Sequence, residues 1–157
     1  MVKSRREVLK SGGGMTLMAL LVAAGWLKPG SAAAQAWNKS AFEAKSMDEA
    51  MKSLGGGVPA QSKDIVFVST PDIAENGAVV PISITSSIPK TESIAILIEK
   101  NPNTLAGSFD IPPGTEPAIS TRVKMGQTSN VYALVKADGK YFVASKEIKV
   151  TLGGCGG

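Results

Sequence analysis

The sequence predicts an all-β chain, an immunoglobulin-like antiparallel sandwich, with a short helical segment before it and a glycine-rich arm after it. Three observations predict this class. Apolar residues recur at every second position in about seven short runs between residues 65 and 152. Clusters of Asn, Gly and Pro separate these runs at the spacing of a sandwich. The composition, 43% hydrophobic and 19% charged, is that of a chain able to form a packed core.

Residues 38–54 show a helical period, with apolar side chains every three to four positions. Two capping-box patterns, Ser40-x-x-Glu43 and Ser46-x-x-Glu49, mark possible helix starts, and the glycines at 55–57 end the segment. We expect one or two short amphipathic helices that pack against something else.

After Pro59 the period changes to two, and the apolar runs that follow are the expected strands. Asp138-Gly139 lies between two of them and is typical of a two-residue hairpin turn. Pro81 lies inside another run, which indicates an edge strand or a bulge that another chain could cover. The expected strands are 65–68, 78–85, 93–99, 119–125, 131–135 and 141–143, the last continuing through 152.

The composition excludes several classes of function. The chain has no histidine and one cysteine, so it cannot build a zinc, blue-copper or iron–sulfur site alone, nor a Ser-His-Asp or Cys-His pair. Residues 1–34 carry five Lys or Arg against one Glu, and the remaining residues carry twelve of each sign. Because the whole excess of +4 lies in the N-terminal segment, we expect no nucleic-acid partner.

The N-terminal segment has the features of a twin-arginine export signal. Arg5 and Arg6 precede an apolar run of 13 residues, 15–27, which is too short to span a membrane. Small residues then offer cleavage after Ala34 or Ala36. The sequence therefore predicts a signal peptide at 1–34, a mature domain at 35–152 without a membrane span, and a location in the periplasm of a bacterium.

The only cysteine lies in a tail that has no other side chain, Gly153-Gly154-Cys155-Gly156-Gly157. In an oxidising compartment cysteines normally pair, and this one has no partner within the chain. Five extended residues reach roughly 17 Å, and glycine has the freest backbone of all residues. The tail supplies no base or positive charge. We therefore predict that Cys155 holds a group covalently, that the chain is not an enzyme, and that its partners supply the catalytic groups.

The tail, the export signal and the strand-rich domain together resemble the SoxY family of thiosulfate-oxidation carrier proteins. The segments 93–103, 119–125 and 136–140 are also similar to that family. The resemblance implies that Cys155 bears sulfur as an S-thiosulfonate and a persulfide, with no other cofactor. It implies that Gly153, Gly154, Gly156 and Gly157 form a swinging arm.

The same resemblance implies a set of partners. The permanent one is SoxZ, itself a small sandwich, in a heterodimer. The transient ones are a c-type cytochrome that loads thiosulfate, a hydrolase that releases sulfate and, in some organisms, a sulfane dehydrogenase.

Two other interpretations of the tail remain open. A ubiquitin-like sulfur carrier would be activated at the carboxylate of Gly157, which requires cytoplasmic ATP and so disagrees with the export signal. Alternatively, the chain is an exported structural module that dimerises through a Cys155 disulfide.

Overall fold

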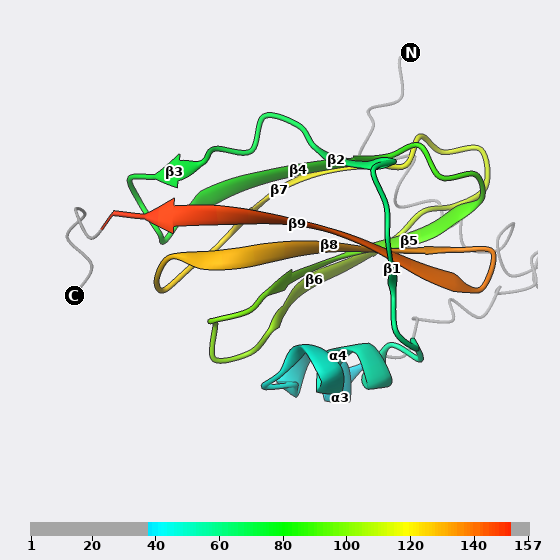
Figure 1. Cartoon of the computed structure of the whole chain (residues 1–157), viewed down its shortest axis with the longest axis horizontal. Helices are drawn as coiled ribbons and strands as arrows, with labels where there is room; N and C mark the ends of the chain where they lie inside the picture. Colours follow the sequence, from blue (N-terminus) through cyan, green and yellow to red (C-terminus); the bar gives the residue numbers. More distant parts are fainter. Residues whose placement is uncertain (1–37, 152–157) are drawn as a thin grey trace, which may run out of the picture. The chain divides into compact units, whose positions relative to one another are not determined.

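The computed structural model describes residues 38–151 of the chain (Figure 1). These residues form two short helices, α3 (Lys39–Glu43) and α4 (Met47–Ser53), followed by nine strands. The strands are β1 (Ala60–Gln61), β2 (Ile65–Phe67), β3 (Ile73–Ala74), β4 (Val80–Ser86), β5 (Thr91–Ile98), β6 (Leu105–Asp110), β7 (Ala118–Val123), β8 (Ser129–Ala137) and β9 (Lys140–Val150).

The strands form two sheets. The larger has the order β1-β9-β8-β5-β6, with β3 paired to the end of β9, and the smaller has the order β2-β4-β7. All pairs are antiparallel except those that β1 and β3 make with β9. Strand β4 pairs with β7 and β5 pairs with β8, so strands that are not consecutive in the sequence are neighbours, as in an immunoglobulin-type sandwich. The predicted all-β sandwich with a short N-terminal helical segment is confirmed.

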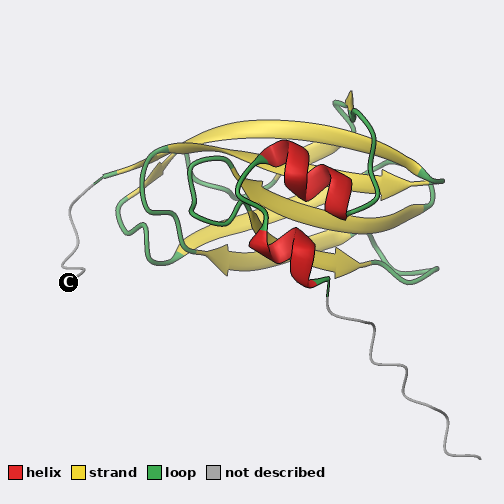
Figure 2. Ribbon diagram, turned by 90° about the horizontal axis from the view of Figure 1, so that it is seen from below, coloured by secondary structure: helices red, strands yellow, loops and turns green. Residues whose placement is uncertain are grey.

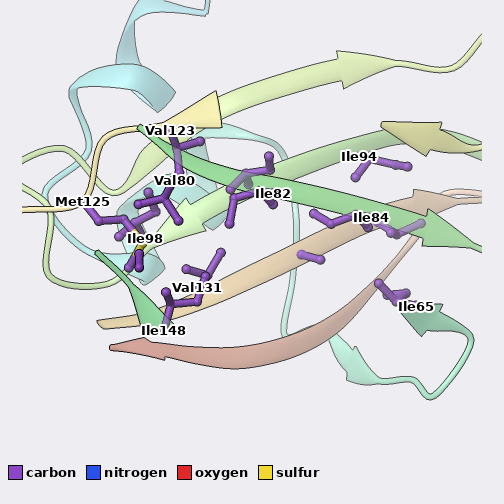
Figure 3. Packing of buried hydrophobic residues seen from close by; sticks show 14 residues of the cluster. Ile65, Val80, Ile82, Ile84, Ile94, Ile98, Val123, Met125, Val131 and Ile148 are labelled. Atoms are coloured by element: carbon purple, nitrogen blue, oxygen red, sulfur yellow. The ribbon is translucent and has the colours of Figure 1, made fainter. Parts of the chain in front are cut away.

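The main core fills the space between the two sheets (Figure 3). Alternate residues of β4, namely Val80, Ile82 and Ile84, are fully buried there, and Ile94 and Ile96 of β5 face them. The period of two along these strands places one apolar row inside, which is the pattern from which the sandwich was predicted.

A second core lies on the outer face of the larger sheet, beneath the two helices (Figure 2). Ala50 and Met51 of α4 pack there, in one cluster with Leu97 of β5 and Leu134 of β8. The helices were expected to pack against something else, and they cover a sheet of their own domain. Because β5 is buried on both faces, residues 94–98 form a continuous apolar run.

The caps of the helices agree with the sequence in one case and correct it in the other. Ser46 caps α4: its hydroxyl accepts from the Glu49 N–H, and the Glu49 carboxylate accepts from the Lys45 N–H. The expected cap at Ser40 is wrong. Helix α3 begins at Lys39, and Asn38, two residues before Ser40, caps it by accepting from Ala41 N at 3.2 Å.

The predicted hairpin at 138–139 is confirmed. Asp138 and Gly139 have φ of 50° and 72°, and Ala137 pairs with Lys140, so a two-residue turn joins β8 to β9. Positive φ at both central residues is the conformation that matches the twist of the flanking strands.

The expectation that Pro81 lies on an edge strand is wrong, because β4 is the middle strand of the smaller sheet. However, β2 pairs only with residues 84–86 of β4. The N–H and C=O of Ser83 are directed to the β2 side, where they bond with Thr70 and Val68. The nitrogen of Pro81, two residues earlier, faces the same side beyond the end of β2. The missing N–H therefore removes no ladder hydrogen bond.

Candidate functional site

The residues that the sequence singles out lie outside the described part of the chain. This holds for Cys155 and for the glycines of the arm, 153, 154, 156 and 157, as well as for Arg5 and Arg6 of the export signal. The structure describes the residues that precede the arm, and the last described residue is Thr151. We call the surroundings of residues 149–151 the arm base.

The arm base is held by backbone hydrogen bonds along its full described length. The end of β9 pairs in parallel with β3, with Ala74 opposite Val150 (Figure 1). The N–H of Lys149 donates to the Asp72 carbonyl at 2.9 Å, and that of Thr151 donates to the Ala74 carbonyl at 3.0 Å. Hydrogen bonds therefore hold the backbone in place up to Thr151.

Two further segments contact the arm base. The N–H of Val150 donates to the hydroxyl of Thr128 at 3.0 Å. Gly77 packs tightly against Met125 and Val150. A Cβ built on Gly77 would be 2.4 Å from the carbonyl oxygen of Met125 and 2.8 Å from a methyl group of Val150. The glycine is therefore required by a close approach of three segments.

Lys146 fixes the loop that leads into β3. Its ammonium group lies 3.0 Å from a carboxylate oxygen of Asp72 and donates to the carbonyl of Thr70. The hydroxyl of buried Thr70 in turn accepts from the Ser83 N–H of β4. Because Lys146 lies on β9, this contact ties the strand that carries the arm to the smaller sheet.

The groups whose pKa departs from its ordinary value lie away from the arm base. The pKa of Glu92 is lowered by the hydrogen bond from Lys136 and by the N–H of Gly139 at the hairpin, and the same bond raises the pKa of Lys136. The pKa of Tyr132 is raised, mainly by burial and to a smaller extent by the neighbouring Glu99. In residues 38–151 no cluster of three His, Cys, Asp or Glu side chains could hold a metal ion.

Neither described helix is long and apolar enough to cross a membrane.

Comparison with known proteins identifies the family. The model of the sulfur oxidation protein SoxY matches residues 50–155, which is more than half of the chain and ends on Cys155. The chain belongs to the SoxY family. Gly153, Gly154 and Cys155 fall within the matched region, whereas the export signal, Gly156 and Gly157 fall outside it.

A solved structure of the same family agrees with this membership. The sulfur carrier protein SoxY from Chlorobium limicola f thiosulfatophilum is 38% identical, covers 67% of this chain and 96% of its own, and superposes with a TM-score of 0.60. The superoxide reductase (neelaredoxin) from Ignicoccus hospitalis is 17% identical, with a TM-score of 0.49 over 55% of this chain and 79% of its own. No curated protein sequence matches the chain.

Reasoning from the sequence missed the residues that form the arm base. Asn76 and Gly77 belong to one of the Asn, Gly and Pro clusters that predict only a break between strands, and the sequence gives no signal for β3 or Thr128. The two-residue pairing between β3 and the end of β9 leaves no periodic signal in the sequence, and the close approach at Gly77 depends on segments far apart in the chain. A solitary lysine such as Lys146 gives no indication of the loop that it holds.

Proposed function

We propose that this SoxY-family chain is a covalent sulfur carrier in the oxidation of thiosulfate, with Cys155 as the attachment site. The observation that carries the proposal is the family match, which ends on the only cysteine of the chain. The related protein from Chlorobium is named a sulfur carrier.

Three covalent steps follow from the chemistry of a thiol and thiosulfate. In the first, the Cys155 thiol and thiosulfate are joined through an S–S bond, releasing one proton and two electrons to a c-type cytochrome. In the second, water attacks the terminal sulfonate sulfur of the S-thiosulfonate and leaves a Cys155 persulfide and hydrogen sulfate. Further oxidation and hydrolysis by partner enzymes restore the thiol.

A fixed base followed by an arm of small residues suits such a carrier. The hydrogen bonds at Lys149, Val150 and Thr151 fix where the arm starts. From Thr151 to Cys155 is four residues, or about 13–14 Å when extended. The sulfur can then enter a narrow active-site channel while the domain stays outside. Tethering also keeps each intermediate at a high effective concentration for the next enzyme.

The outer face of the smaller sheet supports a permanent partner, for which we propose SoxZ. The outer face of the larger sheet is covered by α3 and α4, whereas the smaller sheet has no such cover among residues 38–151. Val66 of β2, Val68 just after β2 and Val79 just before β4 are 50%, 45% and 49% exposed. Exposed apolar side chains on a sheet that lacks a helical cover are consistent with an interaction site.

Export by the twin-arginine pathway to the periplasm completes the proposal, with Arg5 and Arg6 as the recognised pair. This pathway accepts folded cargo, so the carrier can leave the cytoplasm together with its partner chain.

Two variants test the carrier function. Cys155→Ser removes the sulfur nucleophile and leaves the fold unchanged, so sulfur loading should disappear while partner binding remains. Gly154→Val with Gly156→Val keeps the thiol but adds branched side chains and restricts the backbone. We expect the valine variant to react normally with a small thiol reagent and to lose turnover with the partner enzymes by orders of magnitude, because misplacing a reacting group is costly.

Wild-type turnover in the valine variant would contradict the swinging arm. An equal loss of reagent reactivity and turnover would show that the tail folds against its own domain.

A further inference from the structure

A shallow open depression of about 400 Å³ lies where the loop between β5 and β6 meets the end of β7. It is lined by Asn101, Pro102, Asn103, Leu105, Ala106, Arg122, Val123 and Lys124. The lining contains two cations and no carboxylate. Neither Arg122 nor Lys124 makes an ion pair with any described residue, in contrast to Lys39, Lys90, Lys136 and Lys146.

Hydrogen bonds hold the residues around the depression in place. Lys45 donates to the Asn103 side-chain oxygen at 2.6 Å, which brings a third positive charge to the rim. The amide nitrogen is the donor end of the Asn103 side chain. Asn101 donates to the Lys124 carbonyl at 2.7 Å and accepts from the Gly126 N–H at 3.3 Å, so the loop is fastened to the end of β7.

This depression lies at the same end of the sandwich as the arm base. Met125, the residue after Lys124, has its carbonyl oxygen 2.4 Å from the position of a Cβ on Gly77, and a Val150 methyl group is 2.8 Å from that position. The oxygen and the methyl group are therefore at most about 5.2 Å apart, by the sum of these two distances. An arm that reaches about 13–14 Å beyond Thr151 can bring its end over this part of the surface.

We propose that the depression at Arg122, Lys124 and Asn103 is an oxyanion subsite that binds the terminal sulfonate of the loaded arm of the same chain. This inference rests on the proposed function, since only a loaded Cys155 ends in a sulfonate. A guanidinium presents paired N–H donors that match the oxygens of such an anion, and the ammonium and amide add further donors. The subsite holds the charged S-thiosulfonate between visits to partner enzymes. The uncharged thiol has no anion to bind there, so the unloaded arm is not retained.

The first arm of the test uses a free anion and a protein that has no thiol. Sodium sulfate is titrated into mature Cys155→Ser protein at constant ionic strength, with sodium chloride as the reference, and the amide signals of Asn103 and Lys124 are followed by NMR. We expect saturable shifts with sulfate and not with chloride. Replacing Arg122 and Lys124 by Gln should weaken sulfate binding at least tenfold. The charge-matched control, Lys63→Gln with Lys140→Gln, should bind as before.

The second arm tests the tethered anion. Tetrathionate converts the Cys155 thiolate of the mature protein to the S-thiosulfonate: the thiolate attacks a central sulfur, one S–S bond forms, and thiosulfate leaves with the electron pair of the broken bond. Loading should move the same amide signals in the direction that sulfate moves them. It should also raise the sulfate concentration needed for half-saturation.

Equal shifts with sulfate and chloride, or unchanged binding after the Arg122 and Lys124 substitutions, would overturn the subsite. Sulfate binding with no response to loading would overturn its use by the arm. Because the sulfate titration needs no thiol, its failure is distinct from failure of the carrier function, which the turnover of the Cys155 and glycine variants measures.

Discussion

Gly77→Ala is a direct perturbation of the arm base. The added methyl group would lie 2.4 Å from the Met125 carbonyl oxygen and 2.8 Å from a Val150 methyl group. The first contact is with backbone, so no side-chain rotation relieves it. In addition, the N–H of Met125 donates to the Gly77 carbonyl at 2.7 Å, and separating the two segments would weaken this bond.

Overpacking of this kind typically costs about 1–3 kcal/mol, and we expect the upper part of that range because a backbone atom must move. For a domain of this size each kcal/mol lowers the melting temperature by about 4 °C, so the expected fall is roughly 8–12 °C. The assay is thermal unfolding of the mature protein, followed by circular dichroism.

Gly126→Ala is the matched control in the same neighbourhood. A Cβ on Gly126 has no atom within 4 Å, and its N–H bond to Asn101 survives the substitution. We expect it to be neutral or slightly stabilising, because alanine narrows the unfolded ensemble. Equal melting temperatures for Gly77→Ala and wild type, or equal losses at the two glycines, would refute the close packing of the arm base.

Three further predictions concern the helix-covered face, the hairpin and export. Leu97→Ala should cost about 2–5 kcal/mol in chemical unfolding, because Leu97 is fully buried beneath α4; a cost below 1 kcal/mol would contradict that packing. Glu92→Gln should destabilise the domain at neutral pH, because the charged carboxylate accepts hydrogen bonds from Lys136 and Gly139. The pKa of Glu92 is lowered from 4.5, so its stabilising contribution is lost only as the pH falls through that lowered pKa. The difference in stability between variant and wild type should therefore disappear below pH 4.5. A difference that grows in acid would be the wrong sign. Replacing Arg5 and Arg6 by Lys should leave the precursor in the cytoplasm, as fractionation and immunoblotting would show; normal periplasmic accumulation would contradict the export signal.

The parts of the fold that could be predicted are those with a local signal. Alternation in 78–85 and 119–125 identified β4 and β7, and Asp138-Gly139 identified the hairpin because its backbone conformation depends on those two residues. Strand β6 was not predicted: Leu105–Asp110 has a buried residue only at its start, and its Gly107 interrupts the pattern. The register also shifts between β5 and β6 at Ile96 and Leu97, which no sequence pattern announces.

The contacts of the helices, the place of Pro81 and the anchoring of β9 depend on tertiary packing, which the sequence pattern does not show. The apolar face of residues 38–54 indicated a helix that needs a contact, but not that the contact is Leu97 and Leu134 of its own sheet. Likewise Pro81 indicated an edge strand or a bulge, but the short length of β2 allows the proline inside a middle strand. At the candidate site, the count of cysteines predicts Cys155 as the attachment residue, whereas the anchoring of β9 on β3 and Gly77 needed the structure.

The central claim is that Cys155 carries sulfur intermediates. The most direct measurement is the intact mass, with fragmentation, of the protein isolated without reductant from the periplasm of thiosulfate-grown cells. The carrier function predicts monomers that bear an added sulfur atom or an added S–SO₃ group, with the addition localised to Cys155. Protein found only as the unmodified thiol or as a Cys155 disulfide dimer, under conditions of active thiosulfate oxidation, would contradict it.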